Sequence, residues 1–255
     1  MGKLHDLAVK GQAIWFDFIQ RSLVSSGEMQ RLISEGVRGV TSNPTIFEKA
    51  IAGSTDYDLA IKALAGDGKS VDEIYEALVL HDISLTADLF LPVYVQTRGL
   101  DGYVSVEVNP ALAYEADGTI SEAKRLFSLL GRNNVMIKVP ATRAGIPAIE
   151  ALIAQGVNVN VTLLFSVGRY IEAAEAYLAG LEKRRGGRHG NGGPLPGAEP
   201  HTVALDLVDG YLVDVPGPRG EPSGRKADPG ARSPVRIEKE KGVFGPGTIR
   251  DRIKG

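Results

Sequence analysis

The stretch "NNVMIKVPATRAGIPAIEAL", residues 133–152, places Lys138 inside an apolar run that covers residues 135–139, and Pro140 then ends the strand pattern. An ammonium without a partner is costly in an apolar site, so burial favours the neutral amine, which is a nucleophile toward carbonyl carbons. The alternative is a lysine whose stem is buried while its amine reaches water or a carboxylate. The strand therefore predicts either a Schiff-base lysine or a satisfied structural one.

This strand pattern belongs to a regular series along the first 183 residues. Short apolar segments of β character alternate there with helical patterns, which predicts βα units and a parallel sheet. The expected strands cover residues 13–19, 39–43, 103–108, 135–141 and 159–165. A helix with a Thr119–Glu122 capping box, ending at Gly131, is expected before the fourth strand, and another over residues 170–181 follows the fifth.

Each expected strand contributes a polar residue near its carboxyl end. In parallel α/β folds, the reacting groups gather at the carboxyl ends of the strands. Local alternatives exist, because Asp17 could cap the next helix, Asn43 precedes a proline as turn residues do, and Thr162 is a common strand former. A shared pocket accounts for the whole set better, since isolated buried polar groups would each need a partner. The candidates are Asp17, Asn43, Glu107, Lys138, Asn160 and Thr162.

Composition limits the other classes of function. Among 255 residues, 29 Lys and Arg against 31 Asp and Glu give a formal charge of -2, which argues against a nucleic-acid or membrane surface as the main role. The four histidines lack metal-ligand spacing and there is no cysteine, so neither a metal nor a cofactor is expected. The N-terminus has no signal-peptide pattern, and no apolar run approaches the about 20 residues that cross a bilayer, so a cytoplasmic protein with a small-molecule partner is expected.

The sequence changes character at about Arg184. Residues 184–236 are rich in proline, glycine and arginine, which predicts a low-complexity or disordered segment, and residues 237–255 form a C-terminal tail. Only residues 201–215 of this region could offer a strand. Such composition also arises when a GC-rich coding region is read out of frame, so a frame disruption is a second explanation.

Four segments resemble transaldolase, the Schiff-base enzyme of the pentose phosphate pathway. They are "GVTSNPTIF" (39–47), "VSVEVNP" (104–110), "NNVMIKVPATRAGIPAIEALIAQG" (133–156) and "VNVTLLFS" (159–166), and the similarity extends from about residue 12 to residue 183. The resemblance implies a TIM-type (β/α)8 barrel and transfer of a dihydroxyacetone unit from a ketose phosphate, fructose 6-phosphate or sedoheptulose 7-phosphate, to an aldose phosphate. A homo-oligomer is a further possibility.

The resemblance also implies a role for each candidate residue. Lys138 would form the imine, and Asp17 would act as general acid or base for carbon–carbon cleavage. Glu107 and Thr162 would hold a water that shuttles protons, by analogy with the family. Asn43 and Asn160 would bind the hydroxyl groups of the part of the substrate that stays on the lysine.

The chain departs from the family pattern after the fifth strand. A sixth-strand segment resembling Val-Ser-Arg-Val-Asp and a later arginine, which would bind the substrate phosphate, have no counterparts, so the barrel is expected to be incomplete with about five βα units. Two alternatives to transaldolase stay open. One is a class I fructose-6-phosphate aldolase, which the carboxylate of Glu107 disfavours because an amide is expected there; the other is a catalytically impaired, truncated or frame-shifted fragment.

Overall fold

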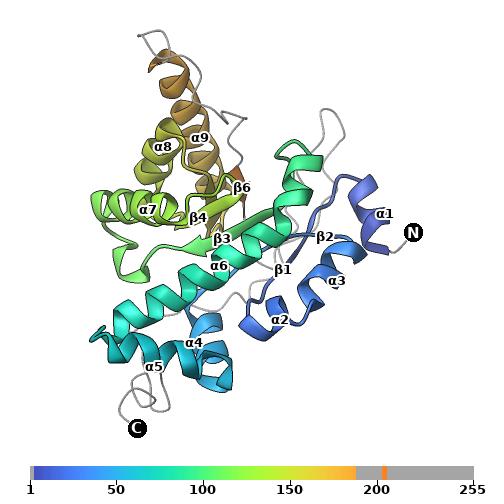
Figure 1. Ribbon diagram of the computed structural model, residues 1–255. Coiled ribbons are helices and arrows are strands. Elements are labelled where there is room, and N and C mark those ends of the chain that lie inside the picture. The colour runs from blue at the N-terminus through green and yellow to red at the C-terminus, as the bar shows by residue number, and fades with distance from the viewer. Residues whose placement is uncertain (1–2, 188–202, 206–255) are drawn as a thin grey trace, which may run out of the picture.

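The computed structural model of the protein describes residues 3–187 and 203–205, which form one parallel sheet with helices between its strands (Figure 1). The strand order follows the chain, so each strand pairs with the next, and the sheet curls into part of an α/β barrel. Of the described strands, the first and the sixth lie at the two edges and do not pair with each other. The strands are β1 (Ile14–Phe16), β2 (Val37–Val40), β3 (Tyr103–Glu107), β4 (Val135–Pro140), β5 (Val159–Thr162) and β6 (Val203–Leu205).

The helices alternate with these strands, as βα units require. Two α-helices lie between β1 and β2 and three between β2 and β3, whereas one α-helix each lies between β3 and β4 and between β4 and β5. The α-helices are α1 (Lys3–Val9), α2 (Arg21–Ser25), α3 (Glu28–Glu35), α4 (Pro44–Gly53), α5 (Asp58–Gly66), α6 (Val71–Gln96), α7 (Ala116–Leu130), α8 (Gly145–Gln155) and α9 (Val167–Gly187); the short 3-10 helices are η1 (Thr55–Tyr57) and η2 (Pro110–Leu112).

All five expected strands are present, and the predicted incomplete α/β barrel is confirmed. The expected start of α7 is wrong. The helix begins at Ala116, and Thr119 lies inside it, where its main-chain N–H donates to Glu115 and its hydroxyl donates to the Leu112 carbonyl at 2.9 Å. The end of α7 was predicted correctly, since Gly131 caps it with a φ of 58°.

The later region is only partly described. Helix α9 runs to Gly187, three residues beyond Arg184, and β6 lies in the only segment of that region expected to offer a strand. It pairs in parallel with β5, in the place of the next barrel strand. The predictions of a low-complexity segment at 184–236, of a tail at 237–255 and of a frame disruption otherwise fall on residues 188–202 and 206–255, outside the described residues.

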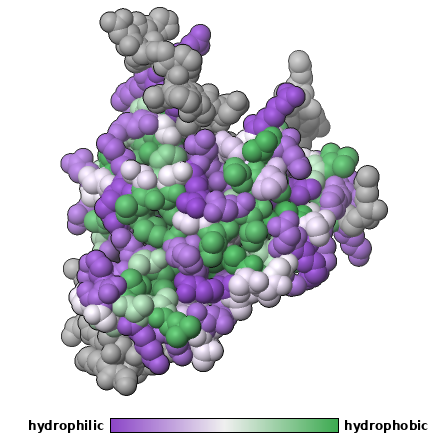
Figure 2. All heavy atoms as spheres, viewed as in Figure 1, coloured by the Kyte–Doolittle hydropathy of each residue, from purple (hydrophilic) through white to green (hydrophobic). Residues whose placement is uncertain are grey.

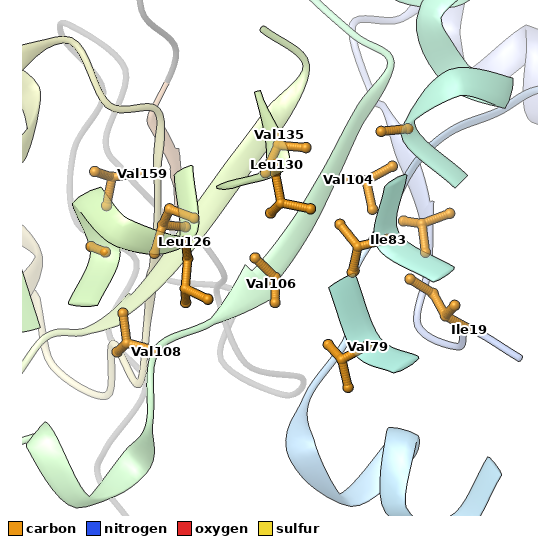
Figure 3. Packing of buried hydrophobic residues seen from close by; sticks show 14 of the residues in the cluster. Ile19, Val79, Ile83, Val104, Val106, Val108, Leu126, Leu130, Val135 and Val159 are labelled. Carbon is orange, nitrogen blue, oxygen red and sulfur yellow. The ribbon is translucent and has the colours of Figure 1, made fainter. Parts of the chain in front are cut away.

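Helix α6 is the longest described helix, with 26 residues, and it starts at a capping box formed by Ser70 and Glu73. Among the described residues it is the one helix long and apolar enough, by length and composition alone, to cross a membrane. Its apolar residues have a role in the core, however, because Val79 and Ile83 face the valines of β3 (Figure 3). Figure 2 shows apolar residues, in green, along the middle of the face that carries α6 in Figure 1; Leu91 and Val95 of this helix are exposed.

The central strands are buried on both faces, but the two faces differ in chemistry. Val104, Val106 and Val108 belong to the hydrophobic core beneath the helices, where Leu126 and Leu130 of α7 also lie (Figure 3). The alternate positions point to the inner, concave face of the sheet and carry mostly polar side chains: Ser105 and Glu107 on β3, Met136 and Lys138 on β4, and Asn160 and Thr162 on β5. Lys138 thus occupies an inner position of a strand whose outer positions are apolar.

Candidate active site

The sheet register brings three candidate residues into one row. Glu107 of β3 pairs with Lys138 of β4, and Lys138 pairs with Asn160 of β5. Paired residues on neighbouring parallel strands project from the same face, so these three side chains share the concave face of the sheet. Thr162 lies two residues beyond Asn160 on the same face, at the carboxyl end of β5. The register therefore places four of the six candidate residues on one face near the carboxyl ends of their strands.

Lys138 is buried, with 7% of its surface exposed. Its Nζ donates to the main-chain carbonyl of Ser42 at 3.0 Å, and no ion pair joins it to a carboxylate among the residues that the structure describes. Ser42 follows β2, whereas Lys138 is on β4, so the side chain reaches across the intervening strand β3. This reach requires the curvature of the sheet. The amine thus has one described hydrogen-bond acceptor and lies beside Glu107 and Asn160 in the row.

Asn160 and Thr162 each bury a polar atom that has no hydrogen-bond partner among the described residues. These atoms are Asn160 Oδ1 and Thr162 Oγ1, on residues that are 0% and 7% exposed. A buried acceptor or hydroxyl without a partner costs about 1–3 kcal/mol, which a bound molecule can recover by hydrogen bonding. The two atoms are therefore suited to contact a polar ligand held next to Lys138.

Asp17 and Asn43 lie on loops just past the strand ends. Asp17 follows β1 directly and is exposed. Asn43 is the N-cap of α4, where its Oδ1 accepts from the Ile46 N–H at 2.9 Å. Capping of this kind is the local alternative that the Asn–Pro sequence allowed. It occupies Asn43 Oδ1, so the Nδ2 group is the end that could contact a ligand. Among the described residues, neither forms a hydrogen bond or ion pair with Lys138, so their assignment to the site stays a prediction.

Glu107 is half-buried and lies near helix α6. Its charge is one cause of a raised pKa for the Tyr75 hydroxyl, after burial and the charge of Glu48. A cavity of about 220 Å³ is lined by Asn43, Tyr75 and Glu107 together with residues of α6 and α7. Lys138 does not line it. Most of the cavity lining comes from α6, α7 and β3, so the cavity does not join Glu107 to Lys138, and we place the candidate site on the concave face from the strand register alone.

A hydrogen-bond network behind this row escaped the sequence analysis. Ser105 Oγ donates to Thr41 Oγ1 at 3.2 Å and accepts from Asn160 Nδ2 at 3.3 Å. The Ser105 carbonyl accepts from Ser42 Oγ at 2.8 Å. The signal that could have identified Ser105 is the period of two in "YVSVEV" (103–108), which places Ser105 and Glu107 on one face.

In the part of the chain that the structure describes, no group of three or more His, Asp or Glu residues is arranged to hold a metal ion. The chemical groups gathered at the site are an amine, a carboxylate, an amide and hydroxyls. An amine with neighbouring proton-transfer groups can add to a carbonyl carbon and form an imine. The set is therefore equipped for covalent carbonyl chemistry by its own side chains.

Several known proteins resemble this chain in sequence. The family model described as transaldolase/fructose-6-phosphate aldolase matches residues 14–204. A transaldolase of Trichodesmium erythraeum is 54% identical over 175 residues, covering 68% of this chain and 46% of that protein. Transaldolase 2 of Nostoc punctiforme is 50% identical over 187 residues (72% and 49%), and a transaldolase of Neisseria gonorrhoeae is 46% identical over 181 residues (71% and 52%). The chain spans about half the length of these curated relatives.

Proposed function

The chain belongs to the transaldolase/fructose-6-phosphate aldolase family, and from this premise we propose that Lys138 forms a Schiff base with a ketose phosphate. The observation that carries the proposal is the row Glu107, Lys138 and Asn160, in which the lysine stands between a carboxylate and an amide. The lysine is buried and forms no ion pair with the described residues. The reaction is the transfer of a dihydroxyacetone unit to an aldose phosphate, as part of cytoplasmic carbohydrate metabolism in the pentose phosphate pathway.

The proposed reaction begins at the amine. Neutral Lys138 adds to the ketone carbon, and loss of water gives an iminium that accepts the electron pair of the breaking carbon–carbon bond. Asp17 takes the proton of the C4 hydroxyl, and an aldose phosphate leaves. A three-carbon enamine stays on Lys138 until an acceptor aldose arrives, and hydrolysis of the second imine returns the amine.

The other site residues serve the proton transfers and the hydroxyl groups. Glu107 and the Thr162 hydroxyl hold the water that moves protons while the carbinolamine forms and breaks down. This role is supported by the partial burial of Glu107 and by the buried, unpartnered Thr162 Oγ1. Asn43 and Asn160 bind the hydroxyl groups of the retained three-carbon unit. Among the described residues, Asn43 Nδ2 and Asn160 Oδ1 have no hydrogen-bond partner, and these are the ends offered to the substrate.

Product analysis tests the function. With fructose 6-phosphate alone, we expect free dihydroxyacetone to stay below one equivalent per protein chain, because the enamine waits for an aldose. Addition of erythrose 4-phosphate should then yield sedoheptulose 7-phosphate, measured by chromatography of the sugar phosphates. Continuous release of dihydroxyacetone would instead support the aldolase alternative. A chain that neither releases products nor forms a reducible adduct would be the catalytically impaired fragment.

The two carboxylates should affect different steps. We expect Asp17→Asn to form the imine normally but to cleave fructose 6-phosphate roughly 100-fold more slowly, the scale of general acid–base catalysis. Glu107→Gln should slow adduct formation instead, because an amide cannot take up the proton. Rates of adduct formation and of aldose phosphate release, measured separately by rapid quench, distinguish these effects. Equal losses in both rates for both variants would contradict the division of roles.

A further inference from the structure

We propose that Ser105 is a positioning residue that fixes the orientation of the Asn160 amide, so that Asn160 presents its carbonyl oxygen to a hydroxyl group of the ketose. Ser105 is fully buried on β3, two residues before Glu107 on the same face. The inference rests on the proposed function, since it assigns the chemistry of one contact within that site.

The hydrogen bonds of Ser105 select one end of the amide. A serine hydroxyl has a single proton, and in Ser105 that proton is donated to Thr41 Oγ1 at 3.2 Å. The remaining capacity of Ser105 Oγ is as an acceptor, and the group that meets it is Asn160 Nδ2 at 3.3 Å. As long as Ser105 directs its proton to Thr41 Oγ1, rotation of the amide by half a turn would place Asn160 Oδ1 against another oxygen lone pair. The Thr41–Ser105 pair therefore holds the amide with its nitrogen inward.

The opposite end of the amide follows from this arrangement. Asn160 Oδ1 is buried and has no partner among the described residues, and Asn160 is next to Lys138 in the row. A carbonyl oxygen can only accept, so the group that it recognises must be a donor such as a hydroxyl. Asn43 uses its own oxygen for the Ile46 N–H and is left with a donor. The two asparagines thus offer complementary ends, which suits a ketone that carries hydroxyl groups on both neighbouring carbons.

The side chain of Ser105 can be removed without deleting the contact that supports Lys138. The carbonyl of Ser105, not its hydroxyl, accepts from Ser42 Oγ at 2.8 Å, and Ser42 in turn supplies the carbonyl that Lys138 contacts. Ser105→Ala therefore deletes the support of Asn160 and leaves the anchor of the amine in place. A positioning effect and a general loss of the site are consequently separable by experiment.

The test measures adduct formation at Lys138 in the full chain with sodium cyanoborohydride and two ketones. Dihydroxyacetone carries a hydroxyl on each side of the carbonyl, and acetone carries none. For Ser105→Ala, we expect the preference for dihydroxyacetone over acetone to fall by about 3- to 10-fold, the range that one lost hydrogen bond produces, while trapping of acetone is unchanged. In the Ser105→Ala background, Asn160→Ala should then have little further effect on this preference.

Two further variants complete the design. Thr41→Val removes the acceptor of the Ser105 proton, which allows Ser105 to donate to Asn160 Oδ1, so it should lower the preference as well. Thr86→Val removes another fully buried hydroxyl, which donates to the Asp82 carbonyl on α6, and should leave the preference unchanged. Circular dichroism checks that each variant is folded.

The outcomes are distinct. An unchanged preference in both Ser105→Ala and Thr41→Val, or equal losses with the two ketones, would overturn the role of Ser105 while the Schiff base stands. If the unmodified chain traps neither ketone at Lys138, the proposed function fails and the inference fails with it. A fall in preference in Ser105→Ala and in Thr41→Val, with Thr86→Val unaffected, would establish it.

Discussion

Lys138→Arg is expected to abolish reductive trapping with fructose 6-phosphate completely. A guanidinium stays protonated at all accessible pH values and has no free electron pair to attack the ketone, although its length and charge resemble those of lysine. Mass spectrometry of the peptide that contains residue 138 should show the sugar adduct in the unmodified chain and none in the variant.

Lys124→Arg is the matched control, because Lys124 is exposed on α7 and lies away from the concave face of the sheet. It should trap as the unmodified chain does. An adduct on Lys124 or Lys10 that persists in Lys138→Arg would show that the amine has been assigned to the wrong residue. Loss of trapping in both variants would point to damage to the fold rather than to the nucleophile.

Asp82→Ala is expected to destabilise the fold by about 3–5 kcal/mol, the cost of leaving the Arg21 guanidinium, which is 17% exposed, without its carboxylate partner. The Asp82 side chain is fully buried on α6 and accepts from Arg21 Nε at 2.9 Å and Nη2 at 2.8 Å. The hydroxyl of Tyr57 donates to its second oxygen at 2.9 Å. Burial, followed by the Asp82 charge, raises the pKa of Tyr57, which keeps this hydroxyl protonated. Urea unfolding followed by circular dichroism measures the loss.

Asp88→Ala provides the comparison for this substitution. Asp88 is also on α6 and pairs with Arg132, but its side chain is 54% exposed. Exposed ion pairs contribute about 0–1 kcal/mol, so this variant should unfold close to the unmodified chain. Tyr57→Phe should fall between the two, because it removes one hydrogen bond to Asp82 and leaves the Arg21 pair intact. Similar unfolding midpoints for Asp82→Ala and Asp88→Ala would contradict the importance of burial.

The position of β4 was predictable because it is a short, mostly apolar run bounded by helix patterns, and that of β5 because apolar and polar residues alternate in it. The start of α7 was predicted wrongly. Thr119 and Glu122 have the spacing of a capping box, but the Thr119 hydroxyl donates to the Leu112 carbonyl instead. Local sequence does not show that an earlier turn, through Glu115, has already begun the helix.

Some residues of the candidate site could be predicted from the sequence and others could not. Lys138 and Glu107 could be identified from polar residues in apolar strands, and the register then placed them side by side. Ser105 was missed because a serine in a strand is unremarkable alone, and its contact with Asn160 spans residues 55 positions apart in the chain. The curvature that lets β3 and β5 side chains meet across β4 is a property of the whole sheet, which no single segment encodes.

The contact between the Lys138 amine and the Ser42 carbonyl has a mechanical consequence. An iminium nitrogen retains one proton. After the imine forms, the Ser42 carbonyl must therefore compete for this proton with any other acceptor near the nitrogen. Ser42 immediately precedes Asn43, whose side chain caps helix α4. We therefore expect the first turn of α4 to be less stable while the covalent bond to Lys138 exists. Amide hydrogen exchange at Ile46 should then be faster in the trapped adduct than in the free chain.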